Sequence, residues 1–185
     1  MRVVAGRWRG RRLLPPPDEA IRPTADRVKE ALFSILGRRV EGAVFVDLCC
    51  GSGALGIEAL SRGGARSVFV DDAPAALALA GRNLARCGAD PGSYTLEAGD
   101  AIAWLERWRP GPGTPWVLVT DPPYRGPVAE RILGLLRAGA PWPGCRALVV
   151  ECASVDGSAV PEPEGWQRRR YGQASLALWL DPAGD

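Results

Sequence analysis

A glycine-rich stretch, VDLCCGSGALG at residues 46–56, has the spacing of a loop that binds a nucleotide-containing cofactor. Gly51, Gly53 and Gly56 spell G-x-G-x-x-G, and Asp71 follows Gly51 by twenty residues. Such glycines let the backbone approach a ligand closely, and the later acidic residue accepts hydrogen bonds from ribose hydroxyls. Taken alone, the pattern fits a dinucleotide-binding oxidoreductase, and a purely structural glycine turn is the alternative.

The carboxylate of Asp47, four residues before Gly51, favours a different cofactor. A carboxylate at a strand tip can receive the ammonium of an amino-acid moiety, whereas it would repel a pyrophosphate. S-adenosylmethionine carries both an amino acid and a ribose, so Asp47 and Asp71 could hold its two ends. Asp100 could accept a hydrogen bond from the adenine amine, cap the helix that follows, or do both. We therefore predict S-adenosylmethionine as the cofactor, with these binding residues: Asp47, Cys49, Gly51, Ser52, Gly53, Asp71, Asp72, Asp100 and Ala101.

A second motif, DPPY at residues 121–124, could act on an exocyclic amine of a nucleic-acid base. The lone pair of such an amine is delocalised into the ring, so two acceptors aimed at its N–H bonds would favour the pyramidal, nucleophilic form. Asp121 can supply one acceptor and the Pro122 carbonyl the other, because proline fixes φ and removes a competing donor. Tyr124 offers a face on which the base can stack. A turn after a strand is the structural alternative.

The elements that must position these motifs alternate between strand and helix from residue 43 onward. Alternation of this kind predicts a parallel sheet with helices on both faces, and ligands bind at the carboxyl edge of such sheets. WQRRRYG and ASLALWL have no helix between them, so they are expected to form an antiparallel hairpin at the sheet edge. The predicted strands cover 43–47, 67–70, 94–98, 116–121 and 146–151, and the predicted helices cover 53–63, 74–88, 100–108 and 128–139.

Before this alternation lie two N-terminal segments. Residues 1–22 read as a basic arm, extended or folded as a β-hairpin around Gly10. Residues 23–38 read as a helix that Thr24 can cap and Gly37 can end. Its apolar face holds Val28, Leu32, Ile35 and Leu36. With the catalytic core at 43–181, we expect one domain over residues 1–185.

Positive charge is concentrated in the first segment of the chain. Residues 1–40 hold ten basic and four acidic side chains, a net charge of +6, whereas the whole chain carries only +2. Local positive charge of this density attracts phosphates, and a merely solvated basic terminus is the alternative. Removing the arm is expected to leave the affinity for S-adenosylmethionine nearly unchanged. The residues predicted to contact RNA are Arg7, Arg9, Arg11, Arg12 and Arg22.

Composition excludes several other classes of protein. The chain has no histidine, and its five cysteines form no CxxC pair, which argues against structural zinc and against Ser-His or Cys-His catalysis. Apolar residues make up 46% and charged residues 24%, a globular profile. The apolar runs are too short to cross a membrane, and the basic start lacks a secretory signal. We therefore expect a cytoplasmic protein with no metal and no membrane partner.

DPPY together with DLCCGSGALG resembles the class I S-adenosylmethionine-dependent amino-methyltransferases. RVVAGRWRGRRL, RPTADRVKEALF and YGQASLALW narrow the resemblance to the RsmD family, bacterial enzymes that methylate the N2 amine of a guanine in 16S ribosomal RNA. The resemblance implies a Rossmann-like, seven-stranded, mostly parallel sheet with a reversed final strand. The chain departs from the family pattern at Cys49, Cys50, Asp71 and Ala73.

The resemblance implies an RNA guanine-N2 methyltransferase that acts on 16S ribosomal RNA, free or within an assembling or assembled 30S subunit, and we expect a monomer. The first alternative, a DNA adenine-N6 methyltransferase, would need a target-recognition domain that this chain has no room for. A protein glutamine methyltransferase typically has asparagine at the position of Asp121. An NAD-dependent oxidoreductase leaves DPPY unexplained, and a non-catalytic RNA-binding module explains only the basic arm.

Overall fold

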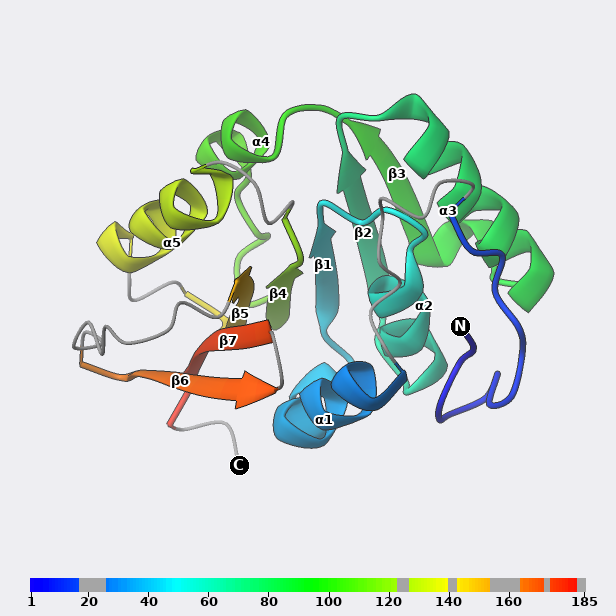
Figure 1. Cartoon of the computed structure of the whole chain (residues 1–185), viewed down its shortest axis with the longest axis horizontal. Coiled ribbons are helices and arrows are strands. Elements are labelled where there is room, and N and C mark those ends of the chain that lie inside the picture. Colours follow the sequence, from blue (N-terminus) through cyan, green and yellow to red (C-terminus); the bar gives the residue numbers. More distant parts are fainter. Residues whose placement is uncertain (17–25, 123–126, 140–142, 154–163, 172–173, 183–185) are drawn as a thin grey trace.

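Seven strands form one mixed sheet in the order β3-β2-β1-β4-β5-β7-β6 (Figure 1). This computed structural model describes residues 1–16, 26–122, 127–139, 143–153, 164–171 and 174–182. Strands β1 to β5 run parallel, whereas β7 is antiparallel to both of its neighbours, β5 and β6. The predicted mostly parallel sheet with a C-terminal hairpin is confirmed. The strands are β1 Val44–Leu48, β2 Arg66–Asp71, β3 Tyr94–Ala98, β4 Trp116–Thr120, β5 Cys145–Ala153, β6 Trp166–Tyr171 and β7 Ala174–Leu180.

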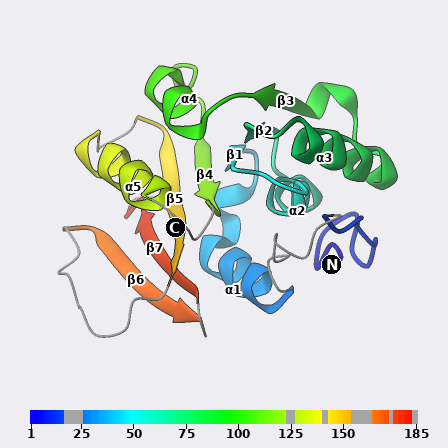
Figure 2. The same cartoon turned by 45° about the horizontal axis from the view of Figure 1, so that its top comes forward.

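Helices cover both faces of the sheet (Figure 2). Side chains of α1, α2 and α3 pack on one face and those of α4 and α5 on the other. Strand side chains alternate between the two layers: Phe45 faces the first group of helices, and its neighbour Val46 faces the second. The helices are α1 Asp26–Leu36, α2 Ala54–Ser61, α3 Pro74–Cys87, α4 Ala101–Arg107 and α5 Val128–Ala138, with 3-10 turns η1 Gly37–Val40 and η2 Pro91–Ser93.

Helix α1 ends where the sequence predicted. Gly37 has a φ of 52°, a left-handed conformation that ends the α-helix and leads into η1. Leu32 and Leu36 are buried as expected, but Lys29 is buried as well. The predicted cap Thr24 lies outside the described residues.

The N-terminal arm pairs its two ends in antiparallel fashion, as the predicted hairpin would, but the pairing is minimal and its turn is not centred on Gly10. Its chain turns over residues 5–10, and its antiparallel pairing among the described residues is a single bridge between Arg2 and Arg12. Val3, Trp8 and Leu13 are buried against α2 and α3, so their apolar side chains help to anchor the arm to the core. The arm is thus a compact loop that lies beside α2 and below α3 (Figure 1).

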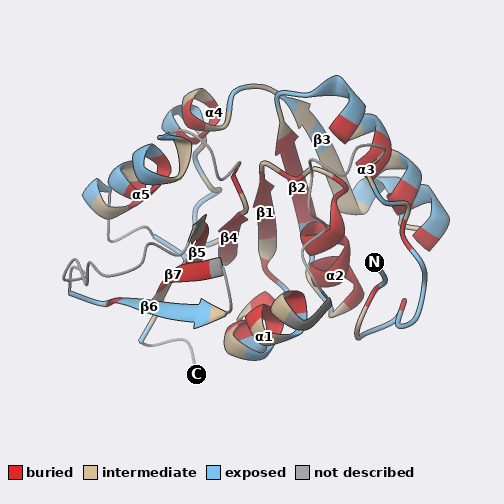
Figure 3. Ribbon diagram, in the orientation of Figure 1, coloured by how far each residue is buried: buried red, intermediate tan, exposed pale blue. Residues whose placement is uncertain are grey.

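Burial falls from the centre of the sheet to its edge (Figure 3). Every residue of α2 is buried, as is every residue of β4. The edge strand β6 is exposed over Gln167–Arg170, and three of these residues are arginines. Charge on an edge strand opposes its pairing with another chain.

Candidate active site

Four aspartates gather at the carboxyl edge of the sheet. Asp47 and Asp71 lie in the carboxyl-terminal halves of β1 and β2, and Asp100 and Asp121 follow β3 and β4. Strands β1 and β4 are adjacent and parallel, although three α-helices and two strands separate them in the chain. The strand order reverses between β1 and β4, and this switch point is where open α/β sheets bind ligands.

Asp47 lies beneath the glycine loop with only 1% of its surface exposed. One carboxylate oxygen, Oδ2, accepts a hydrogen bond of 2.8 Å from the Gly56 amide in the first turn of α2. Burial raises the pKa of Asp47 well above its usual range, the Gly56 amide partly offsets this rise, and the negative charges of Asp121 and Asp71 add to it. A buried carboxylate that repels two neighbouring acids would be stabilised by an arriving cation.

The glycine loop has room for a ligand at its first glycine. Gly51 has a φ of 52°, and a Cβ built on it would meet nothing within 4 Å. Its amide donates to Asp71 Oδ2 at 2.9 Å, while Asp71 Oδ1 accepts from the Ala73 amide at 3.0 Å. A carboxylate has about four lone-pair sites, so Asp71 can also accept from ribose hydroxyls. The open cradle and the acids on either side fit S-adenosylmethionine.

The second and third glycines serve packing. Gly53 has a φ of 74°, and a Cβ there would lie 3.0 Å from the Ala80 Cβ on α3. A Cβ on Gly56 would lie 2.3 Å from the ring of Phe69 on β2. The glycines of this loop therefore divide into one that faces open space and two that allow α2 to approach its neighbours closely.

Gly56→Ala is expected to destabilise the protein by about 1–3 kcal/mol, because the new methyl group overlaps the Phe69 ring inside a packed core. Gly134→Ala is the matched control, since Gly134 is also a helical glycine but has open space around its Cβ position. The control should be neutral or slightly stabilising. Urea unfolding of both variants measures the difference. Equal stabilities would show that Gly56 is not required for packing.

Cys49 and Cys50 lie in the loop between β1 and α2. Cys49 has a φ of 62°, unusual for a residue other than glycine, and is only partly buried. Burial raises the pKa of Cys49 to about 12; the nearby Thr120 hydroxyl lowers it, and the charges of Asp71, Asp47 and Asp72 raise it. Burial also raises the pKa of Cys50. Both thiols are therefore protonated at neutral pH, which opposes a role as a thiolate nucleophile.

The remaining predicted cofactor residues lie around the same edge. Asp100 caps α4, since its Oδ1 accepts from the Ala103 amide at 2.8 Å, which confirms the capping alternative. Ala101 follows as the first residue of α4. Asp72 is exposed just before α3. Ser52 is buried, and its Oγ lies 3.6 Å from the Met1 sulfur.

The structure describes half of the DPPY motif. Asp121 follows β4 directly and is partly buried, and Pro122 is buried. On the paired strands β1 and β4, Asp47 lies opposite Val119 and Leu48 lies opposite Thr120, so Asp121 begins the loop next to the end of β1. Tyr124 lies outside the described residues. The motif therefore begins beside the predicted cofactor loop.

A buried ionic network that the sequence did not predict holds the arm to the core. Glu58 of α2 is fully buried and accepts hydrogen bonds from the amides of Val4 at 2.8 Å and Ala5 at 2.9 Å. It also pairs with the buried Lys29 Nζ at 3.3 Å and with Arg62 Nε at 2.9 Å. Lys29 in turn donates to the carbonyl of Arg2. One signal was available: Lys29 takes an apolar position in the stripe with Leu32, Phe33 and Leu36, and Glu58 interrupts an apolar helix.

Two further polar side chains fix the arm. The Trp8 amide donates to Ser61 Oγ at 3.0 Å, and Ser61 Oγ donates to the Ala5 carbonyl at 2.6 Å. Asn83, fully buried in α3, accepts from the Leu14 amide at 2.7 Å and donates to the Ser52 carbonyl at 3.0 Å. The arm is therefore tied to the glycine loop, so removing it would disturb that loop, and single substitutions are the better test of its role.

The arginines predicted to contact RNA lie on the outer surface of the arm. Arg7, Arg9, Arg11 and Arg12 are all exposed, and the Arg7 guanidinium lies 4.2 Å above the Trp8 ring. Arg22 lies outside the described residues. Four positive charges are thus held on a compact surface rather than on a loose tail.

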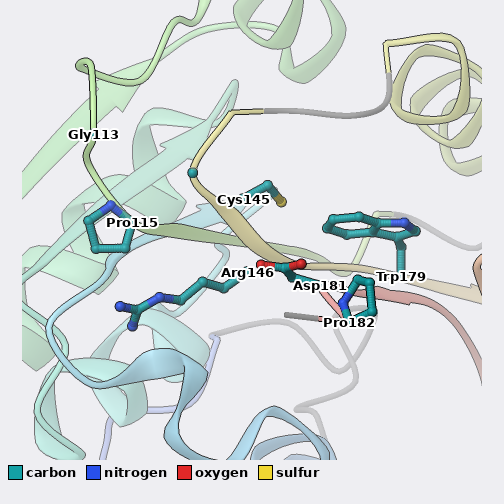
Figure 4. A pocket seen from close by; sticks show the side chains of 8 residues that line it. Gly113, Pro115, Cys145, Arg146, Trp179, Asp181 and Pro182 are labelled. Atoms are coloured by element: carbon teal, nitrogen blue, oxygen red, sulfur yellow. The ribbon is translucent and has the colours of Figure 1, made fainter. Parts of the chain in front are cut away.

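A cavity of about 450 Å³ lies at the opposite edge of the sheet (Figure 4). Pro115 and Cys145 line it at the amino ends of β4 and β5, and Trp179 and Asp181 line it at the end of the antiparallel β7. Arg146, also at this cavity, donates to the carbonyl of Glu41 at 2.8 Å and to that of Arg39 at 3.3 Å. The cavity is separate from the four aspartates.

Among the described residues, no group of acidic, cysteine or histidine side chains is arranged to hold a metal ion. Within the same part of the chain, no helix combines the length and the apolar character needed to span a membrane.

Comparisons with known proteins agree with this geometry. The family model described as Conserved hypothetical protein 95 matches residues 1–180. The chain is 34% identical over 183 residues to Ribosomal RNA small subunit methyltransferase D of Escherichia coli, covering 97% of this chain and 89% of the relative. It is 31% identical over 168 residues to the protein of the same name from Haemophilus influenzae, covering 90% and 84%. The solved structure of yhhF from Escherichia coli matches with 32% identity and a TM-score of 0.76, covering 97% of each chain.

Proposed function

The chain belongs to the Conserved hypothetical protein 95, or RsmD, family of methyltransferases, and from this membership we propose that it methylates ribosomal RNA. The methyl donor is S-adenosylmethionine, and the acceptor is the exocyclic N2 amine of a guanine in the 16S RNA of the small subunit. The observation that carries the proposal is the pairing of β1 with β4 at the switch point, which puts Asp47 and the start of the DPPY motif on neighbouring strand ends. This pairing supports the proposal because a buried carboxylate and Asp121 then share one edge of the sheet.

The residues of this edge would hold the cofactor by complementary charge. Asp47 would attract the ammonium of the amino-acid moiety, and Asp71 would accept from the ribose hydroxyls. Asp100 can accept from the adenine amine through the carboxylate oxygen that does not cap α4. When bound, S-adenosylmethionine supplies an electrophilic methyl group on a positively charged sulfur.

The DPPY residues would prepare the guanine amine. Asp121 and the Pro122 carbonyl each accept one N–H bond of the amine, which turns its lone pair out of the ring system and toward the methyl group. In methyl transfer the amine would exchange one N–H proton for the methyl group, and Asp121 or water would accept that proton. Burial of Pro122 keeps its carbonyl in place during this step.

Mapping modified guanines in 16S ribosomal RNA tests the proposal. RNA from a deletion strain should lack one N2-methylguanine, which the wild-type gene should restore and an Asp121→Ala gene should not. An unchanged set of methylated guanines in the deletion strain would overturn the proposed substrate. Calorimetry separates the oxidoreductase alternative, because S-adenosylhomocysteine should bind at least ~100-fold more tightly than NAD, a gap of about 2.7 kcal/mol.

Asp47→Asn is expected to stabilise the cofactor-free protein while weakening cofactor binding by ~10-fold or more. Because burial raises the pKa of Asp47 in the folded state, wild-type stability falls as pH rises from the unfolded pKa toward the folded pKa. The asparagine variant keeps the acceptor for the Gly56 amide, but its side chain does not ionise, so it should not show this loss of stability with rising pH. The free energy of unfolding should therefore be higher for the variant than for the wild type, and this difference should be larger at pH 8 than at pH 5. Urea unfolding at the two pH values measures it.

Calorimetry with S-adenosylhomocysteine measures the cofactor affinity of the same variant. The neutral amide cannot attract an ammonium as the carboxylate does, so affinity should fall even though the free protein is more stable. A variant with unchanged affinity would show that Asp47 serves only to accept the hydrogen bond from the Gly56 amide.

A further inference from the structure

Helix α3 carries an exposed basic face that joins the arm. Its charged residues are Arg82 and Arg86, both exposed, and its sequence PAALALAGRNLARC contains no acidic residue. The two arginines are four residues apart, so they lie on the same side of the helix, separated by about 6 Å along its axis. The face of α3 that looks away from the sheet is therefore positively charged.

Direct contacts make this face and the arm one surface. The Arg11 guanidinium donates to the backbone carbonyl of Arg86 at 2.9 Å. Arg86 Nε returns a long hydrogen bond of 3.5 Å to the carbonyl of Arg12. Residues 1–16 and 74–87 together hold seven arginines and no acidic residue. The exposed acids Asp72 and Asp90 lie beyond the two ends of α3.

The backbone that carries the surface is tied to the cofactor loop. Asn83 faces inward from α3, between Arg82 and Arg86 in the chain, and bonds both the arm at Leu14 and the loop at Ser52. Because the backbone of the arm and of α3 is fixed to the core, little backbone freedom is lost when the surface binds phosphates, and arginine binds phosphates bidentately. The opposite face of the sheet, under α4 and α5, has exposed arginines mixed with the acids Glu106 and Glu130.

We propose that Arg82 and Arg86 of α3 form, with the arginines of the arm, one continuous RNA-binding surface. This inference rests on the proposed function, because it takes the polyanion to be the RNA substrate. The surface contacts the phosphate backbone without reading sequence and holds the RNA beside the cofactor loop. This surface raises the affinity for RNA, whereas the DPPY motif selects the amine that is methylated.

The double variant Arg82→Gln/Arg86→Gln tests the surface, with Arg107→Gln/Arg131→Gln as the matched control. Both variants remove two exposed helical arginines, but Arg107 and Arg131 lie on α4 and α5. RNA affinity, measured by filter binding to a 16S ribosomal RNA fragment at several salt concentrations, should fall by about 10-fold in the first variant. The slope of log affinity against log salt should become shallower by about 1.5, as two phosphate contacts vanish. The control should match the wild type.

The outcomes separate the two proposals. Equal RNA affinity in the wild type and the α3 variant would overturn the surface but leave the proposed function intact. An equal loss in the control variant would also overturn it, because net charge alone would then explain the effect. Failure of the wild type to bind RNA at all would overturn both. Unchanged affinity for S-adenosylhomocysteine in the α3 variant shows that its fold and cofactor loop remain intact.

Discussion

Replacing Asp121 with alanine is expected to lower the rate of methyl transfer by ~100-fold or more while changing cofactor affinity by less than about threefold. In the proposed mechanism the carboxylate acts on the amine in the transition state, so its loss should appear in turnover rather than in binding. Its place directly after β4, beside but not within the glycine loop, explains why the cofactor contacts should survive. Single-turnover methylation of 16S ribosomal RNA measures the rate, and calorimetry with S-adenosylhomocysteine measures the affinity.

Asp121→Asn separates charge from shape at the same position. The amide keeps one acceptor oxygen, but it lacks the negative charge that strengthens a hydrogen bond to the reacting amine. The rate should therefore fall nearly as far as in the alanine variant. One confounding effect has the opposite sign: removing the Asp121 charge relieves its repulsion of Asp47, so cofactor affinity could rise slightly. Retention of more than about half of the wild-type rate in either variant would mean that Asp121 is not catalytic.

Glu58→Gln is expected to cost about 3–5 kcal/mol of stability, a large part of the total for a domain of this size. The buried glutamate accepts from two arm amides and two cationic side chains, whereas glutamine offers one acceptor oxygen and brings two new donors. Lys29 would then remain buried without its anion. Urea unfolding measures the loss, and hydrogen exchange at the Val4 and Ala5 amides should accelerate as the arm separates from α2.

Two further variants serve as controls for Glu58→Gln. Glu41→Gln makes the same substitution in an exposed ion pair, because the side chain of Glu41 is 59% exposed and that of its partner Arg38 is 92% exposed. Its free energy of unfolding should stay within about 0.5 kcal/mol of the wild-type value. Lys29→Met should cost less than Glu58→Gln, because Glu58 would keep Arg62 and both arm amides as donors. A loss in Glu58→Gln no larger than that of Glu41→Gln would refute the structural role of the network.

Most of the secondary structure could be predicted because periodicity is a local property. Alternating strands and helices from residue 43 onward indicated a parallel sheet, and the carboxyl ends of parallel strands necessarily meet at one edge. The sequence alone therefore predicted that Asp47, Asp71, Asp100 and Asp121 share that edge. It also indicated the capping role of Asp100, which depends only on the helix that follows directly.

Only the tertiary structure decided which of these residues are neighbours. Strand order depends on how helices pack across the sheet, so the adjacency of β1 and β4 was not visible in any local pattern. The same holds for Lys29 and Glu58, which are 29 residues apart in the chain yet form one buried pair. The sequence showed two odd charges in apolar stripes, but not that each was the partner of the other. A buried charge is tolerated only where a long-range contact supplies its counter-ion, and such contacts exist only once the chain has folded.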